Sequence, residues 1–78
     1  MKVLLFGIAK DIVGKSILTL EAPTPKTASD LKDYMRNLYP KFNTLTSIAI
    51  AVNSSYADDS VTLNPDDEIA IIPPVSGG

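Results

Sequence analysis

The chain has 78 residues, no cysteine and no histidine, and a net charge of −2 from seven basic and nine acidic side chains. This length suffices for one domain. Without cysteine or histidine the chain has no disulfides, no Cys/His zinc site and no nucleophile paired with an imidazole base. The basic residues are scattered rather than clustered, so we expect no nucleic-acid partner, and we expect no metal site.

Residues 3–8 are an apolar run that ends at Lys10 and Asp11, and they predict a first strand. The run is too short for a membrane span, and no cleavage-site pattern of a signal peptide follows it. We therefore expect no membrane association and a cytoplasmic location.

A short connector is predicted over residues 10–14, with a single helical turn and with Gly14 as a turn residue. Residues 16–21 favour β-structure and predict a second strand that forms a hairpin with the first. Pro23 and Pro25 end this strand because proline lacks the backbone donor that a sheet needs.

One helix is predicted after these prolines. Thr27, with Asp30 three residues later, resembles a capping box at its start. Pro40 ends the helix. The helical spacing of the apolar residues predicts one face packed on a sheet, formed by Leu31, Tyr34, Met35 and Leu38.

The second half of the chain predicts three further strands. Residues 48–52 are β-branched and alternate large with small side chains, residues 56–57 fit a short edge strand, and residues 68–72 are the last strand. Turn residues separate the strands at 53–55 and at 64–67.

The order of these elements predicts an α+β fold, a β-grasp (ubiquitin-like) roll with a mixed sheet of four to five strands and one main covering helix. We expect the domain to span residues 1–72, followed by a flexible tail over residues 73–78. The last strand is expected beside the first, in the centre of the sheet, because both are the most apolar.

Strand alternation divides the apolar residues between two faces. If Ile69 and Ile71 face the helix, Ile72 faces outward, and the same rule turns Leu4 and Phe6 outward on the first strand. The sequence thus predicts an exposed apolar patch near the tail, of the kind that marks an interface, formed by Leu4, Phe6, Tyr56 and Ile72.

The chain ends in a diproline and two glycines, and two interpretations are open. In one interpretation the residues have no function and form a frayed terminus, which is the usual state of a chain end. The other is that the terminal carboxylate of Gly78 is itself the reactive group, since a tip without side chains can enter a narrow slot.

Several segments together resemble one family. These are residues 2–7, Gly14, the helix start at Thr27, residues 51–53 and, most specifically, the sequence Asp-Asp-Glu-(apolar)₄-Pro-Pro-Val-Ser-Gly-Gly over residues 66–78. The chain resembles the small, sulfur-carrier subunits of molybdopterin synthase, which belong to the ubiquitin-like MoaD/ThiS superfamily. Tyr56 departs from the pattern, because an aliphatic residue is commoner there.

The resemblance implies a sulfur-donating subunit with no catalytic side chains and no bound cofactor. Gly78 would be adenylated by an E1-like adenylyltransferase with ATP, and a persulfide donor protein would then convert it to a thiocarboxylate. The large subunit of molybdopterin synthase would use this sulfur to build the dithiolene from cyclic pyranopterin monophosphate, within a heterotetramer. The tail that inserts into the large subunit would comprise Pro73, Pro74, Val75, Ser76 and Gly77.

Three alternatives stay open on the sequence. The chain could carry sulfur for another pathway, such as formation of the thiamine thiazole. It could be a ubiquitin-like modifier whose Gly78 becomes linked to lysines of target proteins. It could also be a binding module in which the two glycines have no role.

Overall fold

The computed structural model describes residues 1–45 and 47–73. Its elements, in chain order, are β1 (Lys2–Leu5), α1 (Gly7–Val13), β2 (Ile17–Thr19), α2 (Ala28–Leu38), η1 (Pro40–Thr44), β3 (Ala49–Val52), β4 (Ser55–Ala57) and β5 (Glu68–Ile72). The five predicted strands and the predicted main helix are all present, most of them with ends shifted by one to three residues.

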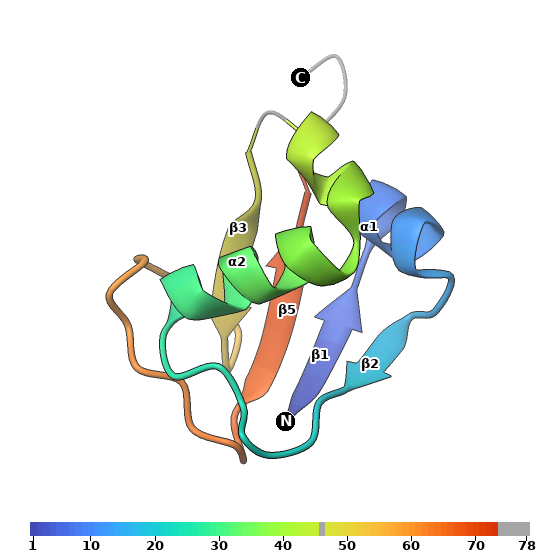
Figure 1. The fold of residues 1–78 in the computed structure, drawn as a ribbon. Coiled ribbons are helices and arrows are strands. Elements are labelled where there is room, and N and C mark those ends of the chain that lie inside the picture. Colours follow the sequence, from blue (N-terminus) through green and yellow to red (C-terminus); the bar gives the residue numbers. More distant parts are fainter. Residues whose placement is uncertain (46, 74–78) are drawn as a thin grey trace.

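The five strands form one mixed sheet in the order β2-β1-β5-β3-β4. β1 is antiparallel to β2 and parallel to β5, and β3 is antiparallel to both β4 and β5. The hairpin of the first two strands and the central position of the last strand are therefore confirmed. Helix α2 crosses one face of the sheet (Figure 1), which is the β-grasp arrangement that the sequence predicts.

The core lies between α2 and this face of the sheet. Side chains at alternate strand positions point into it, and Val3, Leu5, Ile69 and Ile71 are at most 2% exposed. Leu31 and Met35 of α2 and Phe42 of η1 fill the space opposite these strands. Each such large apolar side chain contributes about 1.5–3 kcal/mol when it leaves water.

Helix α2 begins as predicted, and two of its four predicted core residues are buried. The Thr27 hydroxyl accepts a hydrogen bond from the backbone N–H of Asp30 at 3.1 Å. Tyr34 and Leu38, expected in the core, are 40% and 48% exposed. Leu31 and Met35 are fully buried as predicted, and Ala28 is buried with them, so the buried positions are i, i+3 and i+7. The sheet thus contacts a narrower stripe than predicted, and Phe42 of the following η1 joins the core as a further large apolar residue.

The segment after β1 is a helix where the sequence predicted the end of a strand and a connector. β1 ends at Leu5 rather than Ile8, because Gly7 adopts φ +52°, a left-handed conformation that ends the extended backbone. Helix α1 then turns Ala9, Ile12 and Val13 toward the core at i, i+3 and i+4. The predicted turn at Gly14 is confirmed, since it caps this helix with its N–H donating to the Lys10 carbonyl at 2.7 Å.

The loop between β4 and β5 is fastened along the start of α2. The backbone N–H of Ala28 donates to the Val61 carbonyl at 3.0 Å, and that of Leu63 donates to the Lys26 carbonyl at 2.7 Å. Lys32 adds an ion pair with Asp59 at 2.7 Å. Helix α2, with this loop held against its start, covers the inner face of the sheet. The opposite face carries no helix in the described part of the chain.

Candidate functional site

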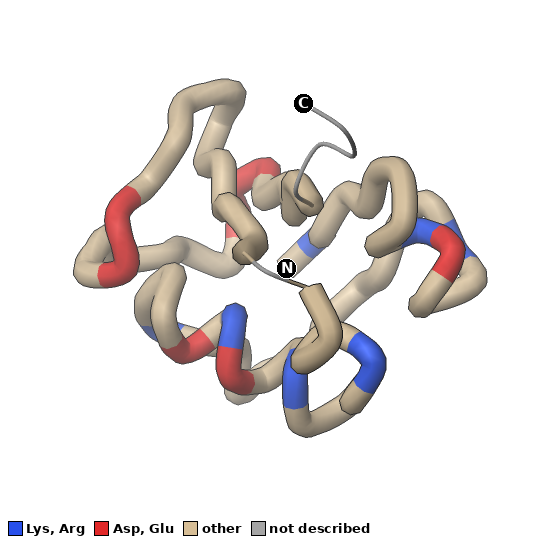
Figure 2. Tube along the Cα trace, turned by 90° about the horizontal axis from the view of Figure 1, so that it is seen from above, with Lys and Arg blue, Asp and Glu red and all other residues tan. Residues whose placement is uncertain are grey.

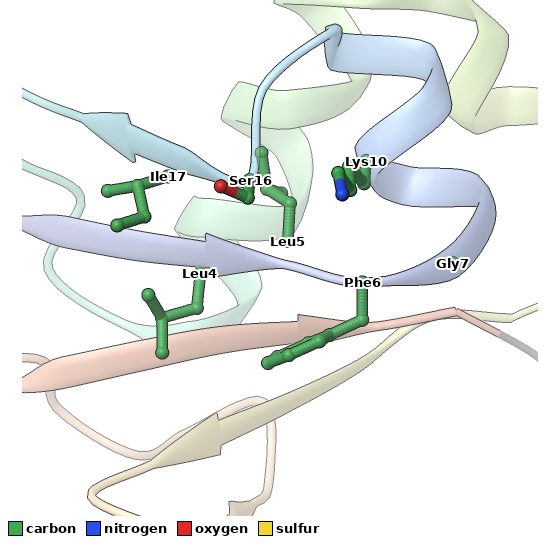
Figure 3. A pocket seen from close by; sticks show the side chains of 7 residues that line it. All are labelled: Leu4, Leu5, Phe6, Gly7, Lys10, Ser16 and Ile17. Atoms are coloured by element: carbon green, nitrogen blue, oxygen red, sulfur yellow. The ribbon is translucent and has the colours of Figure 1, made fainter.

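The sheet face turned away from α2, here called the open face, carries the outward residues of the central strands. Leu4 and Phe6 point to the same side of β1, and Leu5 to the other (Figure 3). Leu4 pairs with Ala70 of β5, and Ile72 of β5 pairs with Ala49 of β3. Because Leu5 pairs with Ile71, Phe6 follows beside Ile72 at the same end of the sheet. The predicted outward orientation of Leu4, Phe6 and Ile72 is confirmed.

Tyr56 also belongs to the open face, but it does not lie beside Phe6. It pairs with Ala51 of β3, and Ala51 pairs in turn with Ala70. Tyr56 therefore stands on the edge strand β4, with β3 and β5 between it and β1. The predicted patch is thus divided: Phe6 and Ile72 lie at one end of the central strands, and Tyr56 lies at the β4 edge of the sheet. Its role as an interface stays a prediction.

Small side chains form the middle of the open face. Ala49, Ala51 and Ala70 lie between the larger residues at its end and edges, and Ala51 is only 7% exposed. Phe6 is 49% exposed and Tyr56 76% exposed on either side of them. A flat alanine centre between exposed aromatic rings lets a partner approach the sheet closely, and exposed apolar patches of this kind mark interaction sites.

The chain leaves β5 at the Phe6 end of the open face. A Cβ atom added to Gly7 would lie 3.4 Å from Cγ of Pro73, so the two residues are close neighbours. Since Gly7 directly follows Phe6, Pro73, the last described residue, lies near Phe6. The other predicted tail residues lie outside the described part of the chain, and these are Pro74, Val75, Ser76, Gly77 and Gly78.

Charge is unevenly distributed around this surface (Figure 2). The five charged residues after Lys41 are all acidic, and these are Asp58, Asp59, Asp66, Asp67 and Glu68. Lys10 and Lys15 belong to α1 and the loop after it, while Lys41 contributes with α1 residues to a shallow depression. Around α1, the three lysines Lys10, Lys15 and Lys41 outnumber the one acidic residue Asp11, whereas the charged residues of the loop between β4 and β5 are all acidic.

The described part of the chain has an apolar interior and no metal-binding cluster. Among residues 1–45 and 47–73, the buried set contains no polar or charged residue, and no cluster of acidic side chains could hold a metal ion. No helix in these ranges has the length and apolar character needed to cross a bilayer. The reactive group that the sequence suggests is the Gly78 carboxylate, with the open face beside the start of the tail.

Sequence reasoning missed one residue of the open face. Ile17 of β2 pairs with Leu4 and is 45% exposed. The signal was present, because alternation within residues 16–21 turns Ile17 outward when Leu18 and Leu20, which are 9% and 6% exposed, face the core. The open face consequently extends from Ile17 on β2 to Tyr56 on β4.

Comparisons with known proteins agree with this arrangement over the length of the chain. Residues 3–78 match the ThiS family. The chain is 37% identical over 81 residues to a molybdopterin synthase sulfur carrier subunit of Dictyostelium discoideum, covering 99% of this chain and 94% of that one. It is 38% identical over 79 residues to the subunit of the same name from Arabidopsis thaliana, covering 100% and 82%.

Solved structures share the fold. A putative molybdopterin converting factor subunit 1 of Pyrococcus furiosus superimposes with a TM-score of 0.82 at 24% identity, covering 95% of both chains. The small archaeal modifier protein 1 of Methanosarcina acetivorans gives 0.78 at 26% identity, covering 99% and 94%. A chain in the complex of subunits 1 and 2 of the molybdopterin-converting factor of Helicobacter pylori gives 0.64 at 24%, covering 99% and 96%. With its β-grasp sheet and its full-length sequence match, the chain belongs to the ThiS family.

Proposed function

We propose that this chain is the sulfur-carrier subunit of a molybdopterin synthase in the cytoplasm. The observation that carries the proposal is its similarity to sulfur carrier subunits of that enzyme, 37% identity over 99% of the chain. The open face supports it, because an apolar docking surface lies beside the point where the chain leaves β5 toward Gly78.

The proposed chemistry takes place on the Gly78 carboxylate. A carboxylate is a poor electrophile, so an E1-like adenylyltransferase first joins it to AMP from ATP and releases pyrophosphate. A persulfide sulfur of a donor protein then forms a bond to the carbonyl carbon while the bond to AMP breaks. The carrier and the donor are then joined by an S–S bond. A second thiol of the donor attacks the donor's own sulfur in this bond and forms a disulfide with it. The S–S bond to the carrier breaks, and the thiocarboxylate remains on Gly78.

The second half of the proposed reaction takes place on the large subunit. Each thiocarboxylate gives its sulfur to cyclic pyranopterin monophosphate and returns to a carboxylate with oxygen from water. A dithiolene holds two sulfurs, so two carriers are used per product, in accord with a heterotetramer built around a dimer of large subunits. The catalytic side chains are assigned to the large subunit, in accord with the lack of histidine and cysteine in this chain.

Docking on the large subunit is assigned to the open face. Phe6 and Ile72 are nearest to Pro73, where the tail begins, and Tyr56 contributes at the far edge. A large-subunit partner is supported by the Helicobacter pylori structure, in which subunits 1 and 2 are present together. Pro73 and Pro74 restrict the stem of the tail, which lowers the conformational entropy lost when residues 75–78 enter the partner.

A reconstituted reaction tests this proposal. The chain is incubated with ATP, the adenylyltransferase, the persulfide donor, the large subunit and cyclic pyranopterin monophosphate, and molybdopterin is measured. We expect product with the full chain and none with a variant that lacks Gly77 and Gly78. Sulfur loading without molybdopterin, but with formation of the thiamine thiazole in the corresponding assay, would assign the chain to the other carrier pathway.

One observation favours a second candidate, a ubiquitin-like protein modifier. The chain is 26% identical to the small archaeal modifier protein 1 of Methanosarcina acetivorans over almost its whole length. A modifier forms an amide bond between Gly78 and target lysines. Digestion of a cell extract would then yield peptides in which a lysine carries a Gly-Gly remnant, whereas a carrier alone leaves none.

A further inference from the structure

A groove opens where β1 passes into α1 and faces the start of β2 (Figure 3). It has a volume of about 440 Å³ and is lined by Leu4, Leu5, Phe6, Gly7, Lys10, Ser16 and Ile17. Its two sides are joined by a hydrogen bond from the backbone N–H of Leu5 to the Ser16 carbonyl at 2.9 Å. Phe6 belongs both to this groove and to the open face, so the two surfaces are continuous.

The lining combines apolar walls with one positive charge. Leu4, Phe6 and Ile17 provide apolar surface, and Lys10 is the one charged residue among the residues that line the groove. Lys10 forms no ion pair within residues 1–45 and 47–73. Its sequence neighbour Asp11 lines a different depression, between α1 and η1, together with Lys41. The ammonium group is therefore available to an acidic partner.

The groove suits a protruding side chain better than a small molecule. Small-molecule sites enclose most of their ligand and fix it with several convergent polar groups. This groove opens to solvent, and its polar side chains are Lys10 and Ser16, both on exposed residues. An aliphatic or aromatic side chain with a carboxylate beside it matches both the apolar walls and the ammonium group.

We propose that the protein that receives the tail inserts an apolar side chain into this groove and pairs an adjacent carboxylate with Lys10. The inference rests on the proposed function, because it assigns a second contact to the partner that docks on the open face. The excess of lysines over the single Asp11 around α1, and the acidic residues of the loop between β4 and β5 (Figure 2), favour an orientation in which a carboxylate of the partner lies toward α1. The groove then fixes that orientation beside the start of the tail.

The first test reverses the charge of Lys10. The binding partner is the purified large subunit, and its affinity for Lys10→Glu is compared with that for Lys26→Glu at low and at moderate ionic strength. Lys26 is also exposed, but it lies before α2 beside Leu63, in a different part of the fold from the groove. Both variants change the net charge equally, so they differ only in position.

We expect Lys10→Glu to weaken binding about tenfold or more, most strongly at low ionic strength, and Lys26→Glu to change it less than about twofold. Equal losses for the two variants would show that only net charge matters, and this would overturn the inference. An unchanged affinity of Lys10→Glu would do the same.

The second test removes the apolar wall. Ile17 in the groove is 45% exposed, and Ile8, which lines the other depression, is 48% exposed, so the two isoleucines are a matched pair. We expect Ile17→Ala to weaken binding of the large subunit about fivefold to tenfold and Ile8→Ala to leave it within about twofold. Because Ile17 also lies on the open face, this loss supports the groove only together with the loss for Lys10→Glu. The reverse order, or equal effects, contradicts a role of the groove.

A third variant separates failure of this inference from failure of the proposed function. Phe6→Asp changes the open face and, because Phe6 also lines the groove, the groove as well. If Phe6→Asp abolishes binding while the Lys10 and Ile17 variants bind normally, the proposed docking holds and the groove has no part in it. If Phe6→Asp also binds normally, the assigned docking surface is wrong, and the groove inference fails with it.

Discussion

The two faces of the sheet are built from the same strands, yet their side chains differ: the buried residues of the inner face are all apolar, whereas the open face combines apolar residues with Lys2, Thr19 and Glu68. On the inner face Val3 and Ile71 are fully buried, and on the open face Phe6 and Ile17 are about half exposed, at 49% and 45%. The inner residues are needed to build a core. On the open face several large apolar residues stay exposed in the isolated chain, as expected if they form the docking surface that we propose.

The largest expected contrast comes from the same substitution at two neighbouring positions. Leu5→Asp places a carboxylate in the core, where an unpaired charge cannot be accommodated, and we expect the chain to unfold. Phe6→Asp places it in solvent, and we expect a cooperative thermal transition near that of the original chain but at least a hundredfold weaker binding of the large subunit, on the order of 2.7 kcal/mol.

Circular dichroism melts and binding titrations check this pair. An unfolded Phe6→Asp variant would show that Phe6 belongs to the core. A folded Leu5→Asp variant would show that the distinction between the two faces is drawn wrongly.

A milder version of the contrast uses two neighbouring isoleucines in β5. Ile71→Ala leaves a cavity among the fully buried residues, and we expect it to lower the free energy of unfolding by about 2–5 kcal/mol. Ile72→Ala, on the open face, should lower it by less than half as much and should weaken binding of the large subunit about tenfold. Denaturant titrations together with binding measurements separate the two effects, and similar stability losses would contradict the assignment of faces.

The smallest expected effect concerns the start of helix α2, on the inner side of the sheet. Thr27→Ala removes the hydroxyl that caps α2, and we expect a loss of about 1 kcal/mol in unfolding free energy. Thr27→Ser keeps the hydroxyl and should retain most of the stability. Binding of the large subunit should be unchanged in both variants, and weaker binding of Thr27→Ala would mean that the partner also contacts this side of the fold.

Most of the fold was predictable because its signals are local. Alternation in residues 68–72 placed β5 and its inward residues, and Thr27 with Asp30 marked the start of α2. The fold class followed from the order of these elements.

The errors arose where tertiary packing decided the outcome. The left-handed conformation of Gly7 ended β1 early, and an apolar run that fits a strand also contained the helical spacing of Ala9, Ile12 and Val13. Tyr34 and Leu38 fit the apolar stripe of α2 but are exposed, whereas Phe42 of η1, which the prediction did not place in the core, is buried.

The candidate site was predictable in part. Alternation gave the outward direction of Leu4, Phe6 and Ile72, but the distance of Tyr56 from Phe6 depends on strand order, which only the sheet pairing reveals. The groove at Lys10 joins residues of β1, α1 and the start of β2, so no single segment of the sequence indicated it.

The central claim is that Gly78 carries sulfur, and the intact mass of the chain isolated from its native cells tests it most directly. The account predicts a species heavier by the exchange of one oxygen for one sulfur, with fragment ions that place the change at Gly78. Its absence from cells that are actively making molybdopterin, together with Gly-Gly remnants on lysines of other proteins, would contradict the account and identify a modifier.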